Sequence, residues 1–468
     1  MKKLLKLLLI LSVLITAFPS SQAQAAPPPP DRPWLSEVIE ADDLNVSEGI
    51  SIARLPGTNT LVVAYTGERP SLNHRILKFA IQVQKGTGNC GIPKDWYCME
   101  VDNTPFAGWS PSIAVVQDPK NRDLVRIGIS YMDMFELTLK YANNVYDKKT
   151  AQLTGSWQVE TIDGPTPIIY RAAWVNSLTF DPQTGKPVIA YDTLEADLLG
   201  NPMNKGWLNT TTYVGAGNGN CGVSNSWNCV QITTDLTLKA FTHIGLGWID
   251  SKLYYFYTSQ NGLSYATLAP GMSCHNPDYY CEVIDNTNTV VGEDLKVSSW
   301  SGNLPGTPGY NPLVRENGVN IVYKDEPNNL IKFATTPKTG PLFKVSDIAS
   351  YGTADVSSLS VSTDANYFAA ATFSSPSYYG NDIVLARPAA AYGMLFGDGC
   401  GFTMGTWVCD VALTAERYSK PGELAAIDVN GGNLVSIVHN QYYPIRDFHG
   451  LQILRQEDYK MGLPLIRR

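Results

Sequence analysis

The sequence is short of charged side chains and histidine, and it carries none of the short motifs that mark common catalytic sites. Charged residues make up 17% of the chain, against about a quarter in a typical soluble domain. The five histidines show no metal-ligand spacing. Gly-x-Ser-x-Gly, His-Glu-x-x-His and a phosphate-binding glycine loop are all missing. The common signatures of serine hydrolases, zinc proteases and nucleotide-binding enzymes are therefore excluded. The sequence requires no cofactor and indicates no metal site, with structural calcium left open.

The chain also lacks an excess of basic residues and, beyond residue 26, any long apolar run. It begins with Lys2, Lys3 and Lys6, continues with an apolar stretch and reaches Ala26 through small residues. This order predicts a cleaved signal peptide over 1–26, followed by a Pro-rich spacer over 27–33. Without the three leader lysines the net charge of -8 becomes -11, which disfavours nucleic acid as a partner. We expect a secreted protein, extracellular or at the cell surface, that is monomeric and has no membrane span.

The eight cysteines fall into four close pairs with repeated flanking sequences. Gly-Asn-Cys-Gly precedes Asp-Trp-Tyr-Cys and Ser-Trp-Asn-Cys, and Gly-Asp-Gly-Cys-Gly precedes Thr-Trp-Val-Cys. In an exported protein such pairs predict disulfides, because zinc binding needs a closer spacing of cysteine or histidine. The predicted disulfides are Cys90 with Cys98, Cys221 with Cys229, Cys274 with Cys281, and Cys400 with Cys409.

The stretch 112–163 is the template of a repeat. It reads as four short strands over 112–116, 125–131, 137–142 and 157–162, with alternating apolar residues and polar turns between them. Seven such units follow one another, spaced by about sixty residues. The second strand usually ends in Tyr, the third often reads Leu-Lys-aromatic-Ala, and the fourth opens with an aromatic residue. Because these residues recur in nearly every unit, we interpret them as packing residues.

The two ends of the repeat region complement each other. The segment starting at Trp34 matches a fourth strand, whereas the last unit stops after its third strand, 451–454. Docking of the first segment beside the last strand removes an exposed sheet edge. The sequence therefore predicts an all-β, seven-bladed β-propeller of four-stranded antiparallel blades over 34–456, with a C-terminal tail over 457–468. An open solenoid would need polar caps, which are not visible.

The candidate site residues lie in loops that share one rim of this propeller, since function usually sits on loops held by a rigid scaffold. Asp133, Asp192 and Asp325 follow second strands, where a carboxylate commonly stabilises a turn. Asp133 and Asp192, with Glu68, are instead an acid–base set if the protein cleaves glycosidic bonds.

Further rim residues are candidates for ligand binding. The cations suit a carboxylate ligand, and Trp109 and Trp174, placed before first strands, suit a sugar ring, with a plain capping role as the alternative. His439 lies on a loop with a second histidine and has a weak case for proton transfer. These candidates are Arg69, Trp109, Arg171, Trp174, His243, Lys324, Asp325 and His439.

The phrase Leu-Pro-Gly-Thr-Asn-Thr-Leu-Val-Val-Ala-Tyr-Thr-Gly-Glu-Arg over 55–69 resembles the first hairpin of sialidases. The resemblance implies an exported bacterial propeller of the broad sialidase-like group. The Arg-Ile-Pro signature of that family is missing, with Ser47-Glu48-Gly49 in its place, and so are its Ser-x-Asp-x-Gly-x-Thr-Trp boxes. The tyrosine nucleophile and arginine cluster of sialidases are therefore not carried over to this chain.

Two functions remain open at this point. The first is a non-catalytic binding module that recognises a glycan or an extracellular protein at the funnel rim. The second is a glycan-active enzyme, either a sialidase-like glycoside hydrolase or a polysaccharide lyase, that uses rim carboxylates and arginines. The first is preferred because no acid–base constellation stands out.

Overall fold

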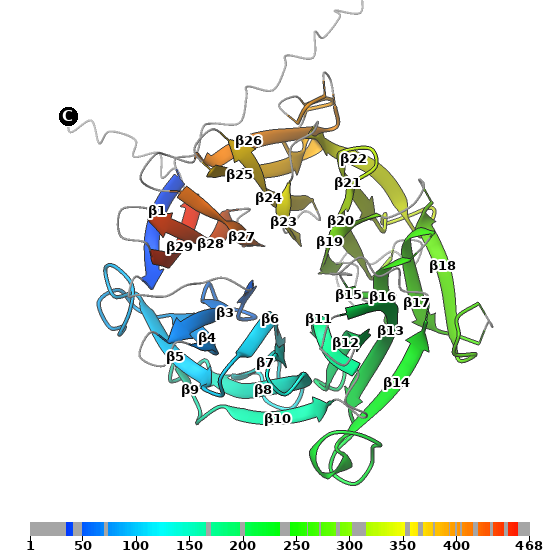
Figure 1. The fold of residues 1–468 in the computed structure, drawn as a ribbon. Coiled ribbons are helices and arrows are strands. Elements are labelled where there is room, and N and C mark those ends of the chain that lie inside the picture. The colour runs from blue at the N-terminus through cyan, green and yellow to red at the C-terminus, as the bar shows by residue number, and fades with distance from the viewer. Residues whose placement is uncertain are drawn as a thin grey trace, which may run out of the picture.

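Seven antiparallel sheets are arranged around a central axis as the blades of a propeller, in a computed structural model of the chain (Figure 1). The predicted fold is therefore confirmed. The expected leader, spacer and tail lie outside the described residues. The structure describes residues 34–40, 49–69, 74–164, 170–196, 202–234, 244–259, 261–270, 273–286, 291–301, 315–351, 356–363, 368–377, 380–392, 394–397, 400–402, 405–414, 420–430, 434–443 and 448–456.

Each blade runs from an innermost first strand to an outermost fourth strand. Blade 1 consists of β2 (Ile50–Arg54), β3 (Leu61–Arg69), β4 (His74–Gln82) and β5 (Trp96–Asp102). Blade 2 consists of β6 (Ala107–Gln117), β7 (Leu124–Asp133), β8 (Thr138–Asp147) and β10 (Gln158–Asp163), with the short β9 (Gln152–Leu153) paired to β8. Blade 3 consists of β11 (Tyr170–Phe180), β12 (Pro187–Ala196), β13 (Pro202–Tyr213) and β14 (Trp227–Thr233).

The remaining blades follow the same order. Blade 4 consists of β15 (Ile244–Ile249), β16 (Lys252–Ser259), β17 (Gly262–Leu268) and β18 (Tyr279–Asp285). Blade 5 consists of β19 (Val291–Ser301), β20 (Asn317–Asp325), β21 (Leu330–Thr335) and β22 (Lys344–Ser350). Blade 6 consists of β23 (Ser357–Thr363), β24 (Ala369–Ser377), β25 (Gly380–Pro388) and β26 (Trp407–Leu413).

Blade 7 is built from both ends of the chain, as predicted. Its first three strands are β27 (Lys420–Val429), β28 (Val435–Tyr443) and β29 (Phe448–Gln456), and its fourth is the N-terminal β1 (Trp34–Glu40). In the β1–β29 pairing Ser36 lies opposite Leu454 and Glu37 opposite Ile453. Ile39 of β1 is fully buried with Leu451 and Ile453. The last blade therefore has no free edge on β29, because β1 covers it.

Apolar side chains pack between neighbouring blades, because each sheet is buried on both faces. The core between blades 1 and 2, for example, joins Leu77 and Phe79 of one sheet to Ile127 and Ile129 of the next. In the described part of the chain the only helices are two short 3₁₀ turns, Val223–Asn225 and Ala389–Tyr392. No helix of the described residues is long and apolar enough to cross a membrane.

Serine hydroxyl groups connect the innermost strands. A first strand is an edge, so its outward backbone N–H groups need partners. Ser51 of blade 1 accepts the Ile113 N–H of blade 2 at 3.1 Å. Ser112 of blade 2 accepts the Leu178 N–H of blade 3 at the same distance. In blade 6 three alternate serines, Ser358, Ser360 and Ser362, bind blade 7 in this way.

The tyrosine that ends the second strand is held by a polar contact between blades. Tyr131 of blade 2 donates its hydroxyl to Asp102 of blade 1 at 2.7 Å. Lys140, the lysine of the Leu-Lys-aromatic-Ala sequence, lies 3.6 Å from Asp102 and 2.7 Å from Asp133. The recurrent tyrosine and lysine thus form a buried polar clamp and do not serve packing alone. The clamp recurs with Tyr65, Lys78 and Glu40, and with Tyr323, Lys332 and Asp285.

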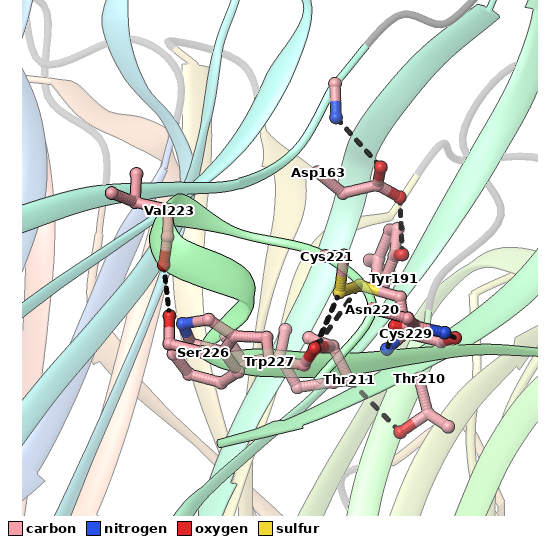
Figure 2. Close-up of a disulfide and its surroundings, with 12 residues drawn as sticks. Asp163, Tyr191, Thr210, Thr211, Asn220, Cys221, Val223, Ser226, Trp227 and Cys229 are labelled. Atoms are coloured by element: carbon pink, nitrogen blue, oxygen red, sulfur yellow. Dashed lines mark hydrogen bonds between the residues drawn. A yellow bond between two sulfur atoms is a disulfide. The ribbon is translucent and has the colours of Figure 1, made fainter. Parts of the chain in front are cut away.

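The four predicted disulfides are all present, each in the hairpin between a third and a fourth strand. Figure 2 shows the Cys221–Cys229 bridge. The asparagine before the first cysteine explains the repeated motif, since Asn220 accepts the Cys229 N–H at 2.7 Å and donates to its carbonyl at 3.0 Å (Figure 2). Asn89 binds Cys98 in the same way. In each of these two hairpins, the asparagine side chain and the disulfide together hold the two arms of the hairpin against each other.

Candidate functional site at the channel mouth

In blades 2, 3, 5, 6 and 7 the first strand bulges where it enters the sheet, on the rim that also carries the connections from second to third strands. In blade 3 Ala172 lies opposite Thr193, but the next paired residue, Asn176, lies opposite Tyr191. Two extra residues are thus accommodated in β11 around Trp174, and we call this segment the blade-3 bulge. First strands are the innermost strands of the ring (Figure 1), so these bulges lie near the propeller axis, and we call this inner end of the rim the channel mouth. Bulges are common next to active sites.

The two tryptophans are placed differently from the prediction. Trp109 and Trp174 were expected in loops before first strands, whereas they lie inside β6 and β11. Period-two alternation begins only at Ser112, which predicts a strand that starts there. The irregular backbone before Ser112 nevertheless pairs with β7 back to Ala107. Pairing across a bulge cannot be read from an apolar pattern, because the bulge breaks the alternation.

The backbone around Trp109 is held in an unusual conformation. Phe106, Gly108 and Ser110 have φ values of 65°, 95° and 47°. Positive φ is costly for phenylalanine and serine, and it accumulates at sites where side-chain placement matters. At Gly108 a Cβ atom would lie 2.8 Å from the backbone of Leu77. This segment is therefore closely fitted against blade 1, and it fixes the direction of the Trp109 side chain.

The two tryptophans lie against each other. Their ring centroids are 5.6 Å apart at an interplanar angle of 49°, and both side chains are half-buried. The guanidinium carbon of Arg75, at the start of β4, lies 5.5 Å from the Trp109 ring centroid, within range of a cation–π contact. Blades 1, 2 and 3 therefore contribute to one stack of Arg75, Trp109 and Trp174.

Two phenylalanines in the turns next to β6 and β7 were not predicted as site residues. Phe106 is 45% exposed and Phe135 is 76% exposed. Their loops are joined, because Met134 donates its N–H to the Phe106 carbonyl at 3.1 Å. The available signal was the apolar pair Met134-Phe135 between Asp133 and Glu136, in a turn where polar residues are expected. We call Phe106, Trp109, Phe135 and Trp174 the aromatic rim.

Asp133 supports the turn that exposes Phe135. It is fully buried at the end of β7, and its Oδ1 accepts the N–H groups of Phe135 and Glu136, both at 3.0 Å. Its Oδ2 accepts from Lys140 at 2.7 Å. Both oxygens of the carboxylate are thus engaged by its own blade, which is the geometry of a turn-stabilising aspartate.

Asp192 lies within β12 and not in a turn after it, which corrects the expected position. The residue is fully buried, and its Oδ1 accepts the Val175 N–H of the blade-3 bulge at 2.8 Å. Its Oδ2 has no hydrogen-bond partner among the described residues. Burial raises the pKa of the carboxyl to about 7, although the backbone N–H groups of Val175, Asp192 and Trp174 act in the opposite direction.

The polar candidates of blade 5 are occupied by local contacts. Asp325 is buried at the end of β20, and its Oδ1 accepts from the Asn328 side chain at 3.0 Å and from the Asn328 backbone N–H at 3.3 Å. The Lys324 side chain is 7% exposed, and its Nζ lies 3.6 Å from Glu326 and 6.0 Å from the Tyr351 ring centroid. Asp133, Asp192 and Asp325 are not paired with one another, since each bonds within its own blade.

His439 was expected on a loop, whereas it lies within β28, at the place where most other blades have the tyrosine of the second strand. It is fully buried, and its Nδ1 lies 3.0 Å from the Asn440 carbonyl oxygen, while Nε2 has no partner among the described residues. Burial lowers the pKa of the imidazole to about 4. His439 is therefore neutral at neutral pH. The described residues contain no cluster of three metal-ligating side chains.

The remaining candidates fall at the limits of the described structure. Glu68, near the end of β3, is half-buried and lies opposite Arg75 in the sheet. Arg69 and Arg171 have backbones in β3 and β11, and their side chains lie outside the described part. His243 lies outside the described residues altogether. The structure therefore brings together Trp109 and Trp174 and leaves a role for these four as a prediction.

Neither a family model nor a curated protein matches the sequence. Among solved structures, the chain is similar to the GH93 α-L-arabinofuranosidase of Fusarium graminearum in complex with arabinobiose, at 11% identity and a TM-score of 0.40, covering 90% of this chain and 98% of that one. It is similar to the polysaccharide lyase Uly1 at 8% identity and a TM-score of 0.42, covering 88% and 91%.

A third similar structure is the β-propeller domain of the trilobed protease from Pyrococcus furiosus, at 9% identity and a TM-score of 0.40, covering 92% of this chain and 99% of that one. The propeller neighbours thus include a glycoside hydrolase, a polysaccharide lyase and part of a protease. Likenesses at TM-scores below 0.5 carry no information about the chemistry of the aromatic rim.

Proposed function

We propose that this protein binds carbohydrate at its channel mouth through the aromatic rim. The observation that carries the proposal is the exposure of Phe106 and Phe135. They lie in two connected turns, one just before β6, which carries Trp109, and one just after its partner β7. Aromatic faces bind the apolar C–H faces of sugar rings, and such rings need a rigid support to act as a platform. Asp133 supports the Phe135 turn, and the stack of Arg75 on Trp109 supports the tryptophan pair.

The proposal is tested with the purified mature chain on a panel of soluble polysaccharides, by affinity electrophoresis. We expect retention by at least one polysaccharide. Phe135→Ala is expected to weaken retention about fivefold, since losing one stacking face costs on the order of 1 kcal/mol. Phe106→Ala is expected to act in the same direction.

Leu395→Ala is the matched control, because Leu395 is 85% exposed in the hairpin connection of blade 6, on the opposite rim. It is expected to leave retention unchanged. Retention that responds equally to the Leu395 and Phe135 variants would show nonspecific apolar adhesion, and the absence of retention across the panel would overturn the proposal.

A glycan-active enzyme is the second candidate, and the Asp192 carboxyl is the observation that favours it. A buried carboxyl with a pKa of about 7 is a residue type that serves as a general acid. Reducing-end release from the same panel separates the two functions. An enzyme releases product and loses that activity in Asp192→Asn, whereas a binding module retains polysaccharide without release.

The disulfides and the proposed polysaccharide ligand both favour an extracellular location. Four disulfides are characteristic of oxidising compartments, and a polysaccharide ligand is available outside the cell. Secretion itself rests on the predicted signal peptide over 1–26.

A further inference from the structure

Asp192 is the support of the blade-3 bulge. Its Oδ1 accepts the N–H of Val175, the neighbour of Trp174, at 2.8 Å. The regular register of β11 with β12 is interrupted between Ala172 and Asn176, and the Asp192 carboxyl binds the backbone within this interruption. Asp192 therefore supports the backbone of the bulge directly beside Trp174, whose ring also contacts Trp109.

Blade 7 shows that this support does not need a charge. Its first strand bulges with the same register, with Pro421 opposite Gln441 and Ala425 opposite His439. The residue equivalent to Asp192 is Asn440, whose Oδ1 accepts the Leu424 N–H at 3.0 Å. A neutral amide thus performs in blade 7 the task that a carboxyl group performs in blade 3.

We propose that Asp192 is a protonation-dependent positioning residue, which holds the blade-3 bulge and Trp174 in the described geometry while its carboxyl is neutral and loosens them when it ionises. The neutral acid resembles Asn440 in shape and in its carbonyl acceptor. The ionised acid leaves a charge in a fully buried site, where its Oδ2 has no partner among the described residues. An unpaired buried charge is costly, and movement of the bulge that admits water relieves it.

No charge on the described residues stabilises ionised Asp192. Strand β15, packed against β12, carries no ionisable side chain, and the Tyr191 hydroxyl on β12 itself is bonded to Asp163 at 2.6 Å. The other ionisable residues of β11, β12 and β13 are Tyr170, Arg171, Glu195, Lys205 and Tyr213. Of these, only the Tyr213 side chain is within the described part, at the far end of β13.

The direction of the pH effect follows from the raised pKa. The carboxyl takes up its proton more readily in the folded state than in the unfolded chain, where its pKa is about 4. The contribution to folding is therefore complete below about pH 4 and declines as the pH rises toward 7. Above about pH 7 the bulge carries the full cost of the charge, so Trp174 becomes more mobile in alkaline solution.

The consequence for ligand binding rests on the proposed function, whereas the switch itself does not. If the aromatic rim binds polysaccharide, affinity falls as the pH rises through 7. The pH dependence of Trp174 exposure is therefore measured without any sugar, so that its outcome does not depend on carbohydrate binding. Acrylamide, a small neutral quencher of tryptophan fluorescence, is the probe.

Acrylamide quenching is recorded from about pH 5.5 to about pH 8.5. The wild-type chain is expected to gain quenching with a midpoint near 7, and Asp192→Asn is expected to stay flat at the low-pH level. Trp174→Phe, with Asp192 intact, is expected to lose the pH-dependent part, which assigns the signal to Trp174. Asp123→Asn, at an exposed ion pair with Lys149, is the control and keeps the wild-type profile.

A wild-type profile that is flat over this range, or a transition that survives in Asp192→Asn, would overturn the proposal. If Asp192→Asn fails to fold, the comparison of wild type with Trp174→Phe still tests the proposal. A transition that is unchanged in Trp174→Phe does not come from the bulge and would contradict the proposal. A purely structural Asp192 predicts a lower melting temperature in the asparagine variant and no pH transition in wild type.

Discussion

At the scale of single residues, the buried lysines show that the repeat is held together by charge as well as by packing. Lys140 is 6% exposed and contacts Asp133 and Asp102 at 2.7 and 3.6 Å. Burial alone would lower the pKa of this lysine, but the carboxylates outweigh burial and raise it. Lys140 is therefore charged, and its contact with Asp102 links blade 2 to blade 1.

Removing one partner of such a cluster is expected to be severe. Lys140→Met keeps the length and apolar stem but leaves two buried carboxylates without their cation, which is expected to cost about 3 kcal/mol or more in the free energy of unfolding. Chemical denaturation measures the loss. Lys149→Met makes the same chemical change at an exposed pair with Asp123 and is expected to leave the denaturation midpoint in place. Equal effects of the two variants would contradict the clamp.

At the scale of elements, the disulfide hairpins cover the outer edges of neighbouring blades. The Cys90–Cys98 hairpin of blade 1 donates the Ile92 N–H to Val38 of β1 at 3.1 Å. The Cys274–Cys281 hairpin donates the Asn276 N–H to Ile232 of β14 at 3.0 Å. The Cys400 carbonyl accepts from Ser350 of β22 at 2.9 Å. An outermost strand is an unpaired edge, and these hairpins occupy part of it.

Gly91 tests whether the first hairpin holds β1. It has a φ of 81°, and a Cβ atom there would lie 2.9 Å from the Val38 carbonyl oxygen. Gly86 in the same hairpin has a φ of 83° and no atom within 4 Å of its Cβ position. Both alanine variants carry the cost of positive φ, about 1–2 kcal/mol, but only Gly91→Ala is expected to speed hydrogen exchange in β1. Similar exchange in both variants would contradict the docking.

At the scale of the whole molecule, the ring is closed at one seam by contacts on both its outer and inner sides. On the outer side β1 pairs with β29, and Glu37 lies 3.3 Å from Arg455. On the inner side Arg54 of blade 1 donates its Nε–H to Asp428 of blade 7 at 2.9 Å. Burial raises the pKa of Asp428, and Arg54 acts against this shift.

Deletion of the closing strand is expected to open the ring. A chain that starts at Ala41 lacks β1, so β29 becomes an exposed apolar edge and the protein is expected to aggregate or to unfold at a clearly lower temperature. A chain that starts at Trp34 retains β1 and is expected to match the full mature chain. Size-exclusion chromatography and thermal denaturation compare the three. A stable monomer that starts at Ala41 would show that closure does not need β1.

Local sequence was sufficient to predict the repeat, the four disulfides and the pairing of the chain ends. Each of these features depends on period-two alternation or on neighbouring residues. It was sufficient for Asp133 as well, since an aspartate at the end of a strand bonds the next N–H groups. It was misleading for Trp109 and Trp174, which lie in strands that continue through a bulge, and for Asp192, which lies in the strand opposite the blade-3 bulge. The clamp around Lys140 was missed because its partners belong to two blades.

By itself, then, the sequence determined how many blades there are and how the chain closes on itself, because local patterns recur once per blade. Only the tertiary structure decided what surrounds each polar residue, because burial and contacts between blades join positions that are far apart in the chain. Asp192 and Asn440 illustrate the difference. They occupy the same place in the repeat and accept the same kind of hydrogen bond. The sequence makes only Asp192 ionisable, and its complete burial in the folded ring raises the pKa of that carboxyl to about 7.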